Sequence, residues 1–222
     1  MSDINNTTIY LFSGLGADKS VFEGFSFLNN RKHKFIEWER PKSKVLEEYA
    51  LQLSSQIDTT QKVILIGVSF GGMLVSELSK HIKTEEVILI SSASTPKELP
   101  FLYRVLGKLK LYFFIPTLLL NKPNRLLSFA FGVSIKKYIK ERKQLSQIIK
   151  NTNPKLAKSF IKMIMTWKDN HLERTNSILR IHGDKDMIIP APKNCHFIVK
   201  DGAHFMILTH LKEIDLYLQT VL

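Results

Sequence analysis

The segment from residue 63 to residue 78 constrains the fold more than any other part of the chain. An apolar run at 63–66 leads into Gly67-Val68-Ser69-Phe70-Gly71-Gly72, and a helix-like run at 73–78 follows directly. This pattern predicts a buried strand, a sharp turn and a helix, with Ser69 at the apex of the turn. The glycines let the backbone fold back on itself, and the turn pushes the serine hydroxyl out of the sheet.

Strand-like and helix-like segments alternate along most of the chain. We expect strands at residues 8–12, 34–37, 63–68, 87–91, 178–182 and 196–199, and helices near 20–27, 44–57, 72–82 and 205–221. This alternation predicts the α/β class, with a mostly parallel sheet of about six strands and helices on both faces. A length of 222 residues suits a single domain, which we expect to span residues 1–222.

Residues 97–168 interrupt the alternation. They show no strand pattern, four prolines divide them, and they predict several helices inserted after the fourth strand. We expect most of their large apolar side chains to pack this insert onto the core, and the remainder to roof a pocket above Ser69. The side chains concerned are Phe101, Leu102, Leu106, Leu109, Tyr112, Phe113, Phe114, Leu118, Leu119, Leu126, Leu127, Phe129 and Phe131.

Two downstream segments carry the partners that a nucleophilic serine needs, which are a base and an acid that orients the base. Residues 178–186 predict a short strand and a turn that bears Asp184 and Asp186. Residues 197–205 predict a second strand, a turn, and His204 at the start of the last helix. The order Ser, Asp, His along the chain is that of α/β-hydrolases.

With these pieces the chain resembles the α/β-hydrolase superfamily over nearly its whole length. The resemblance rests on residues 13–16, 67–72, 182–186 and 202–204, in that order. Ser13-Gly14 stands where the family usually has His-Gly, a departure that leaves the backbone role intact. The resemblance implies an α/β-hydrolase fold without its first two strands, in which residues 97–168 form the helical cap.

The resemblance also implies a role for each site residue. Ser69 would be the nucleophile and His204 the general base. The orienting acid would be Asp186, with Asp184 as the alternative because only two residues separate them. The main-chain N–H groups of Leu15 and Phe70 would form the oxyanion hole.

Other reactive residue types are better explained by structure than by chemistry. Ser91, Ser92 and Ser94 follow a strand but lack the glycine bracket of a nucleophile turn. We expect His182 to serve as a structural hydrogen-bonding residue. The remaining histidines show no metal-ligand spacing, so we predict neither a metal site nor a cofactor.

The expected location is the cytoplasm. A single cysteine, Cys195, excludes an intrachain disulfide, and we expect it to be a buried small apolar residue. The N-terminus lacks the basic stretch and apolar core of a secretory signal. The longest strongly apolar run, residues 111–120, is too short to span a bilayer and contains Pro116.

The positive charge is concentrated in one part of the chain. Its 32 Lys and Arg and 20 Asp and Glu give a net charge of +12. Residues 97–168 hold 16 of the bases and two of the acids, net +14, which leaves 16 bases and 18 acids, net −2, elsewhere. Solvated helices rich in lysine would explain this concentration of positive charge in residues 97–168. A basic rim for an acyl carrier protein, a CoA-type phosphate ester or an anionic membrane surface would explain it too.

These observations lead to one main functional hypothesis and two alternatives. The main hypothesis is a serine hydrolase that cleaves an ester or thioester with an apolar acyl part. The first alternative is an esterase or thioesterase directed at carrier-protein or CoA-bound substrates, with an architecture and cap charge similar to those of pimeloyl-carrier methyl ester esterases. The second is a non-catalytic ligand-binding or scaffold protein with the same fold. No nucleic-acid partner is expected, because the chain shows no nucleic-acid-binding motif.

Overall fold

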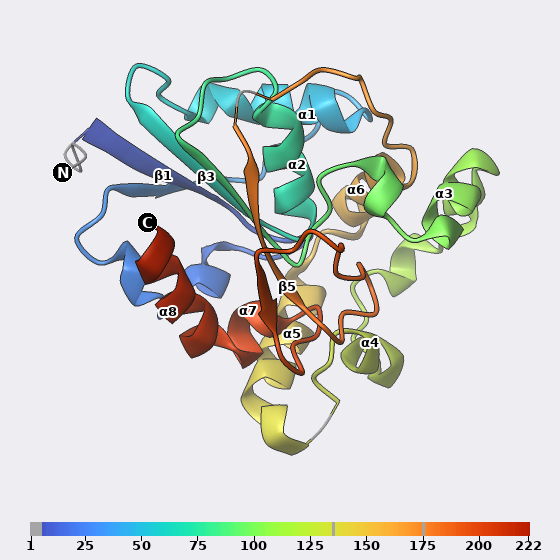
Figure 1. Cartoon of the computed structure of the whole chain (residues 1–222). Helices are drawn as coiled ribbons and strands as arrows, with labels where there is room; N and C mark the ends of the chain where they lie inside the picture. Colours follow the sequence, from blue (N-terminus) through green and yellow to red (C-terminus); the bar gives the residue numbers. More distant parts are fainter. Residues whose placement is uncertain (1–5, 135, 175) are drawn as a thin grey trace.

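The protein is built on a six-stranded sheet in which all five strand pairings are parallel (Figure 1). The computed structural model describes residues 6–134, 136–174 and 176–222. The predicted α/β class is confirmed, and each expected strand is present within two residues of its expected ends. In the sheet order β2-β1-β3-β4-β5-β6, the strands are β2 His33–Phe35, β1 Thr7–Phe12, β3 Lys62–Val68, β4 Glu86–Ile90, β5 Ile178–Gly183 and β6 Phe197–Val199.

Both faces of the sheet are buried, which explains why the central strands read as continuous apolar runs. In β3, Leu65 faces a core completed by α1 (Leu46–Leu53), α2 (Phe70–Leu78) and α6 (Pro154–Met165). The neighbouring Ile66 faces the opposite core, which includes side chains from α5 (Ile139–Asn151), α7 (Met206–Thr209) and α8 (Leu211–Val221). Figure 1 shows α1 and α2 on one side of the sheet and α7 and α8 on the other.

Two of the expected helices differ from the prediction. The segment 20–27 forms two 3₁₀ helices, Lys19–Phe22 and Ser26–Leu28, instead of one α-helix. Gly24 lies between them at φ +89°, a left-handed conformation that a helix cannot continue through. The expected helix at 205–221 is divided into α7 and α8 at His210, whose φ of −126° and ψ of 31° leave the helical region.

The insert, residues 97–168, lies between β4 and β5. Its longer helices are α3 (Phe101–Lys108), α4 (Arg125–Ala130), α5 and α6, and short 3₁₀ helices connect several of them. None of its described residues forms a strand, as predicted. Among all the described residues, no helix is long and apolar enough to cross a membrane.

The expectation that most large apolar side chains of the insert pack onto the core is wrong. Of the thirteen predicted, only Tyr112 is buried, and nine are exposed. The helices α3 and α4 are only eight and six residues long, so each has little surface to bury. The helix α3 does approach α6 closely at Gly107, where a Cβ would collide with the carbonyl of Met165.

Candidate active site

Ser69 occupies a strained turn between β3 and α2. Its φ of 52° and ψ of −119° lie outside the regions that a non-glycine residue normally adopts. Hydrogen bonds on both sides hold the turn, because the Ser69 N–H donates to Ile90 O at 3.0 Å and Ser92 Oγ donates to Ser69 O at 2.6 Å. This supporting role of Ser92 was not predicted from the sequence.

The glycines around Ser69 are needed for close backbone approach. A Cβ on Gly67 would collide with the main chain of Gly71 and Gly72. A Cβ on Gly71 would collide with the carbonyls of Phe12 and Ser13 at the end of β1. The helix α2 can therefore begin directly against the sheet only if these positions lack side chains.

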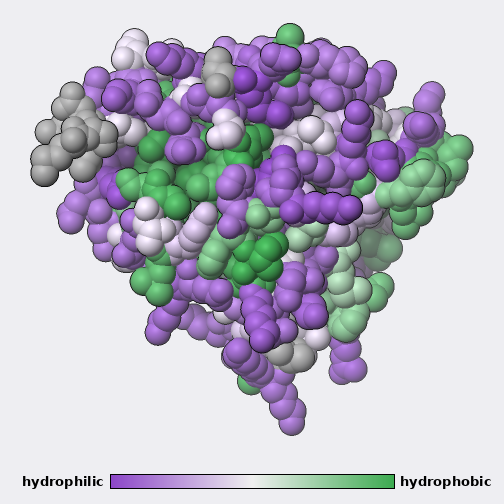
Figure 2. All heavy atoms as spheres, in the orientation of Figure 1, coloured by the Kyte–Doolittle hydropathy of each residue, from purple (hydrophilic) through white to green (hydrophobic). Residues whose placement is uncertain are grey.

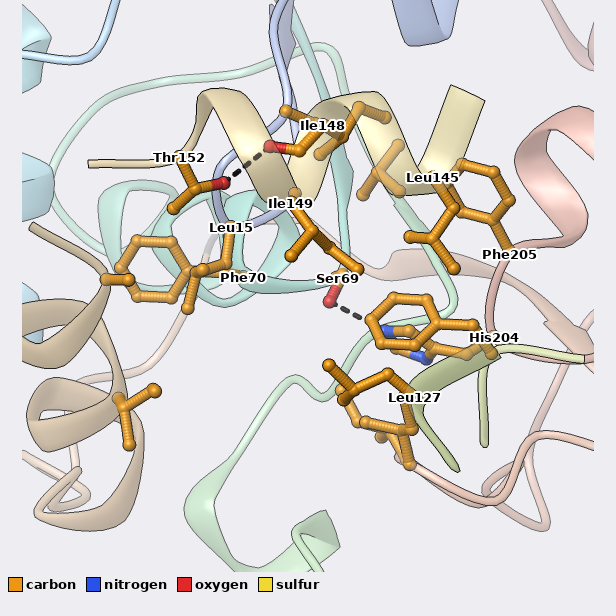
Figure 3. Close-up of a pocket in the computed structure, with 18 of the residues that line it drawn as sticks. Leu15, Ser69, Phe70, Leu127, Leu145, Ile148, Ile149, Thr152, His204 and Phe205 are labelled. Carbon is orange, nitrogen blue, oxygen red and sulfur yellow. Dashed lines mark hydrogen bonds between the residues drawn. The ribbon is translucent and has the colours of Figure 1, made fainter. Parts of the chain in front are cut away.

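A short series of hydrogen bonds connects Ser69 to the turn after β6 and the turn after β5. Ser69 Oγ lies 2.9 Å from His204 Nε2, and His204 Nδ1 lies 2.8 Å from Asp186 Oδ2. His204 is buried, and the ring of Phe131 meets it edge-on at a centroid distance of 5.3 Å. Figure 3 shows the Ser69 hydroxyl directed at His204. These distances fit a nucleophile, a base and an orienting group.

Asp186 is held as a buried carboxylate. Its Oδ1 accepts hydrogen bonds from the N–H groups of Ile188 and Ile189, both at 2.9 Å. Burial by itself would raise the pKa of Asp186, but the adjacent His204 and the hydrogen bonds to the carboxylate outweigh it and hold the pKa well below its usual range. Asp184, the alternative acid, is exposed. The structure therefore brings His204 together with Asp186 and leaves Asp184 in solvent.

His182 provides a further contact to Asp186 from the end of β5. Its buried Nε2 lies 2.7 Å from Ile189 O and 3.2 Å from Asp186 Oδ2. Both neighbours are acceptors, so Nε2 carries the proton and donates. His182 thus joins the two ends of the turn that bears Asp186.

Two main-chain N–H groups beside Ser69 are available to a ligand. Leu15 and Phe70 both line the pocket at Ser69. In the part of the chain that the structure describes, neither N–H group donates to a protein acceptor. Phe70 is the first residue of α2, where helix geometry leaves N–H groups unpaired. The positive end of the α2 dipole also favours negative charge at this point.

The pocket above Ser69 has a volume of about 290 Å³ and apolar walls (Figure 3). The insert contributes much of the lining, with Leu127 from α4, Leu145, Ile148 and Ile149 from α5, and Ile161 from α6. The contribution of α5 was missed from sequence, although its apolar residues recur at helical spacing. Among the described residues, no Asp, Glu, Lys or Arg lines the pocket. No group of three or more metal-ligating side chains suited to an ion occurs among the described residues.

Comparisons with known proteins agree with this architecture. A family model described as "Serine aminopeptidase, S33" matches residues 46–205. A search of curated proteins found no match.

Similar solved structures include an esterase from Thermogutta terrifontis, with a TM-score of 0.67 and 15% identity over 96% of this chain and 88% of that one. A lipase-esterase related protein from Clostridium acetobutylicum has a TM-score of 0.68 and 11% identity over 98% and 95%. The RedJ thioesterase of the prodiginine pathway in Streptomyces coelicolor has a TM-score of 0.66 and 14% identity over 97% and 86%. At these identities the likeness shows a shared fold.

Proposed function

Because the chain belongs to the serine aminopeptidase S33 family and is an α/β-hydrolase, we propose that it cleaves esters or thioesters with an apolar acyl part. One observation carries the proposal. Ser69 and His204 line an apolar pocket of about 290 Å³, and they are hydrogen-bonded to each other and, through His204, to the buried Asp186. This size is at the lower end of the range for small-molecule pockets.

In the proposed reaction, Ser69 Oγ attacks the acyl carbonyl carbon while His204 Nε2 accepts the hydroxyl proton. Asp186 holds the imidazole by its Nδ1–H and stabilises the imidazolium. The N–H groups of Leu15 and Phe70 donate to the developing oxyanion. The C–O or C–S bond then breaks, and the leaving alcohol or thiol takes the proton from His204. Water, deprotonated by the same histidine, then attacks the carbonyl carbon of the acyl-enzyme. The bond between Ser69 Oγ and the acyl carbon breaks, Ser69 regains its proton from His204, and the acyl group leaves as a carboxylic acid.

The pocket lining favours an acyl ester over a peptide with a free N-terminus. An aminopeptidase must hold the substrate ammonium group, and a buried ammonium needs a carboxylate or several acceptors. In the part of the chain that the structure describes, no Asp or Glu lines this pocket. The lining is instead built from leucine, isoleucine, phenylalanine and other apolar residues, which suit a hydrocarbon chain.

A second candidate is an esterase or thioesterase directed at carrier-protein or CoA-bound substrates. The supporting observation is the +14 charge of the insert, which would act as a basic cap above the pocket. A thioesterase is among the proteins of similar fold, which makes thioester substrates a reasonable part of the same proposal. A purely non-catalytic scaffold is not supported, because the Ser69, His204 and Asp186 contacts are intact.

The test is a chain-length series of p-nitrophenyl esters and acyl-CoA thioesters, measured on wild type, Ser69→Ala, His204→Ala and the double variant. Each single change should lower kcat by about 10⁴-fold or more, and the double variant should be hardly worse, because the two groups act as a unit. A fluorophosphonate probe should label wild type and not Ser69→Ala. Ser55→Ala, on the exposed surface, serves as the matched control. Retention of more than about a tenth of the activity in Ser69→Ala would exclude this mechanism.

A further inference from the structure

The insert exposes an unusual amount of apolar surface. Ten of the seventeen large apolar side chains that are exposed in the described residues lie between Phe101 and Phe129, a stretch of only 29 residues. Phe114 is 81% exposed, Leu118 78% and Leu126 77%. Figure 2 shows hydrophobic surface along the right edge of the molecule, where Figure 1 places α3 and, below it, α4. A clustered apolar surface of this kind marks an interaction site.

This surface is continuous with the pocket at Ser69. Leu119 lines the pocket and is also 56% exposed, so the pocket reaches the surface there. On α4, Leu127 lines the pocket while the adjacent Leu126 is exposed. An apolar chain could therefore pass from the exposed surface to Ser69 without crossing a polar region.

Cationic side chains lie beside the apolar surface. A surface groove between α4 and α5 is lined by Arg125, Arg142, Lys143 and Lys150, and none of its described lining residues is acidic. Within the described residues, no Lys or Arg of the insert forms an ion pair. Because these cations have no ion-pair partner in that part of the chain, they can attract phosphate-bearing groups.

We propose that this surface of the insert, defined by the exposed apolar side chains of residues 101–129 and the cationic groove, docks onto an anionic lipid bilayer. A bilayer supplies anionic headgroups for the cations and hydrocarbon for the phenylalanine and leucine side chains. Fluid hydrocarbon accepts side chains that protrude from several short helices, whereas a folded partner needs matching cavities. A symmetric contact with a second copy would bring like charges together, which disfavours self-association.

The docking proposal also defines a substrate class. If the proposed hydrolase function holds, the docked enzyme takes lipids with ester-linked acyl chains directly from the bilayer into the pocket at Leu119. The headgroup phosphate would remain at the cationic groove. The experiment below separates docking from catalysis.

The test is flotation of the full-length protein with vesicles of phosphatidylcholine, alone or mixed with phosphatidylglycerol. Wild type should float with the mixed vesicles, bind pure phosphatidylcholine far less, and lose binding as salt is added. Arg142→Glu with Lys143→Glu should lower partitioning by about 25-fold or more, since each cation near such a surface contributes about fivefold. The triple variant Phe114→Ser, Leu118→Ser, Leu126→Ser should lower it by about tenfold or more.

Matched controls lie outside the insert. Leu216→Ser, at a side chain 64% exposed on α8, controls for the apolar changes, and Lys200→Glu with Lys212→Glu controls for the charge reversals. These controls should float like wild type. All the variants should hydrolyse a short soluble ester at the wild-type rate, which shows that they are folded.

Several outcomes would overturn the docking proposal. The proposal is wrong if wild type does not float, if wild type binds both vesicle types equally, or if the control variants lose as much binding as the variants of the insert. A dimer that the triple variant converts to monomer would assign the surface to a second copy. Slower turnover of an acyl carrier thioester in the charge variant, without vesicle binding, would assign it to a carrier protein. Ser69→Ala should float normally, so its esterase activity tests the proposed function independently.

Discussion

The exchange of Asp186 for Asn tests the proposed mechanism with the smallest change in shape. The amide oxygen can stay where Oδ1 accepts from the N–H groups of Ile188 and Ile189, both at 2.9 Å. The amide nitrogen then replaces Oδ2, which lies 2.8 Å from His204 Nδ1. An amide nitrogen can only donate, so His204 must accept at Nδ1 and carry its proton on Nε2. That nitrogen faces Ser69 and can no longer take the hydroxyl proton.

The expected loss in kcat is about 10³ to 10⁴-fold. At about 1.36 kcal/mol for each factor of ten, the barrier rises by about 4 to 5.5 kcal/mol. The N–H groups of Leu15 and Phe70 remain, so some rate enhancement should survive. The assay is steady-state hydrolysis of a p-nitrophenyl ester. Asp184→Asn, two residues away and exposed, is the matched control and should lose little. The reverse ranking of the two variants would refute this reasoning.

The lowered pKa of Asp186 predicts that the stability of the wild-type protein depends on pH, and Asp186→Asn is the variant that tests this. The pKa of Asp186 is lowered in the folded protein relative to about 3.9 for an ordinary aspartate. The ionised carboxylate therefore stabilises the fold fully above about pH 4, and this contribution is lost as the pH falls through the folded-state pKa. The difference in unfolding free energy between wild type and Asp186→Asn, measured in urea, should shrink from pH 7 to pH 3. A difference that grows toward pH 3 would contradict the lowered pKa.

Three further predictions concern the turn at Ser69, the core and the pocket. Gly71→Ala should destabilise the protein by about 3 kcal/mol or more in urea unfolding, because the new Cβ collides with the carbonyl of Ser13. If the variant is as stable as wild type, α2 does not need a glycine at this position. Trp167→Phe should cost about 1.5 to 3 kcal/mol, because its Nε1–H donates to the fully buried Glu77 at 2.8 Å, and an unchanged urea midpoint would argue against that contact. Ile161→Trp should fill the pocket and lower kcat/KM by about tenfold for the longest acyl esters while sparing acetate; equal effects on all chain lengths would place the acyl chain elsewhere.

Much of the fold and part of the candidate site were predictable from local pattern. Apolar runs of the right length predicted the central strands β1, β3 and β4, because a strand buried on both faces needs apolar residues at consecutive positions. The glycines at 67, 71 and 72 predicted the turn at Ser69, because the requirement for close approach is local in sequence. The prediction of an α-helix at 20–27 was wrong, because the apolar residues of this segment are compatible with 3₁₀ turns and Gly24 adopts a positive φ.

Local patterns were enough to predict the parallel sheet, the serine turn and the order of the candidate residues, because each depends on residues that are close together along the chain. Tertiary structure decided which aspartate meets His204, since Asp184 and Asp186 share one turn and only its path in space directs one of them inward. It also decided that nine of the thirteen large apolar side chains considered from sequence in the insert stay exposed. The composition of a segment shows how apolar it is, but its burial depends on whether other elements cover it. Helices as short as α3 and α4 are covered along only part of their surface.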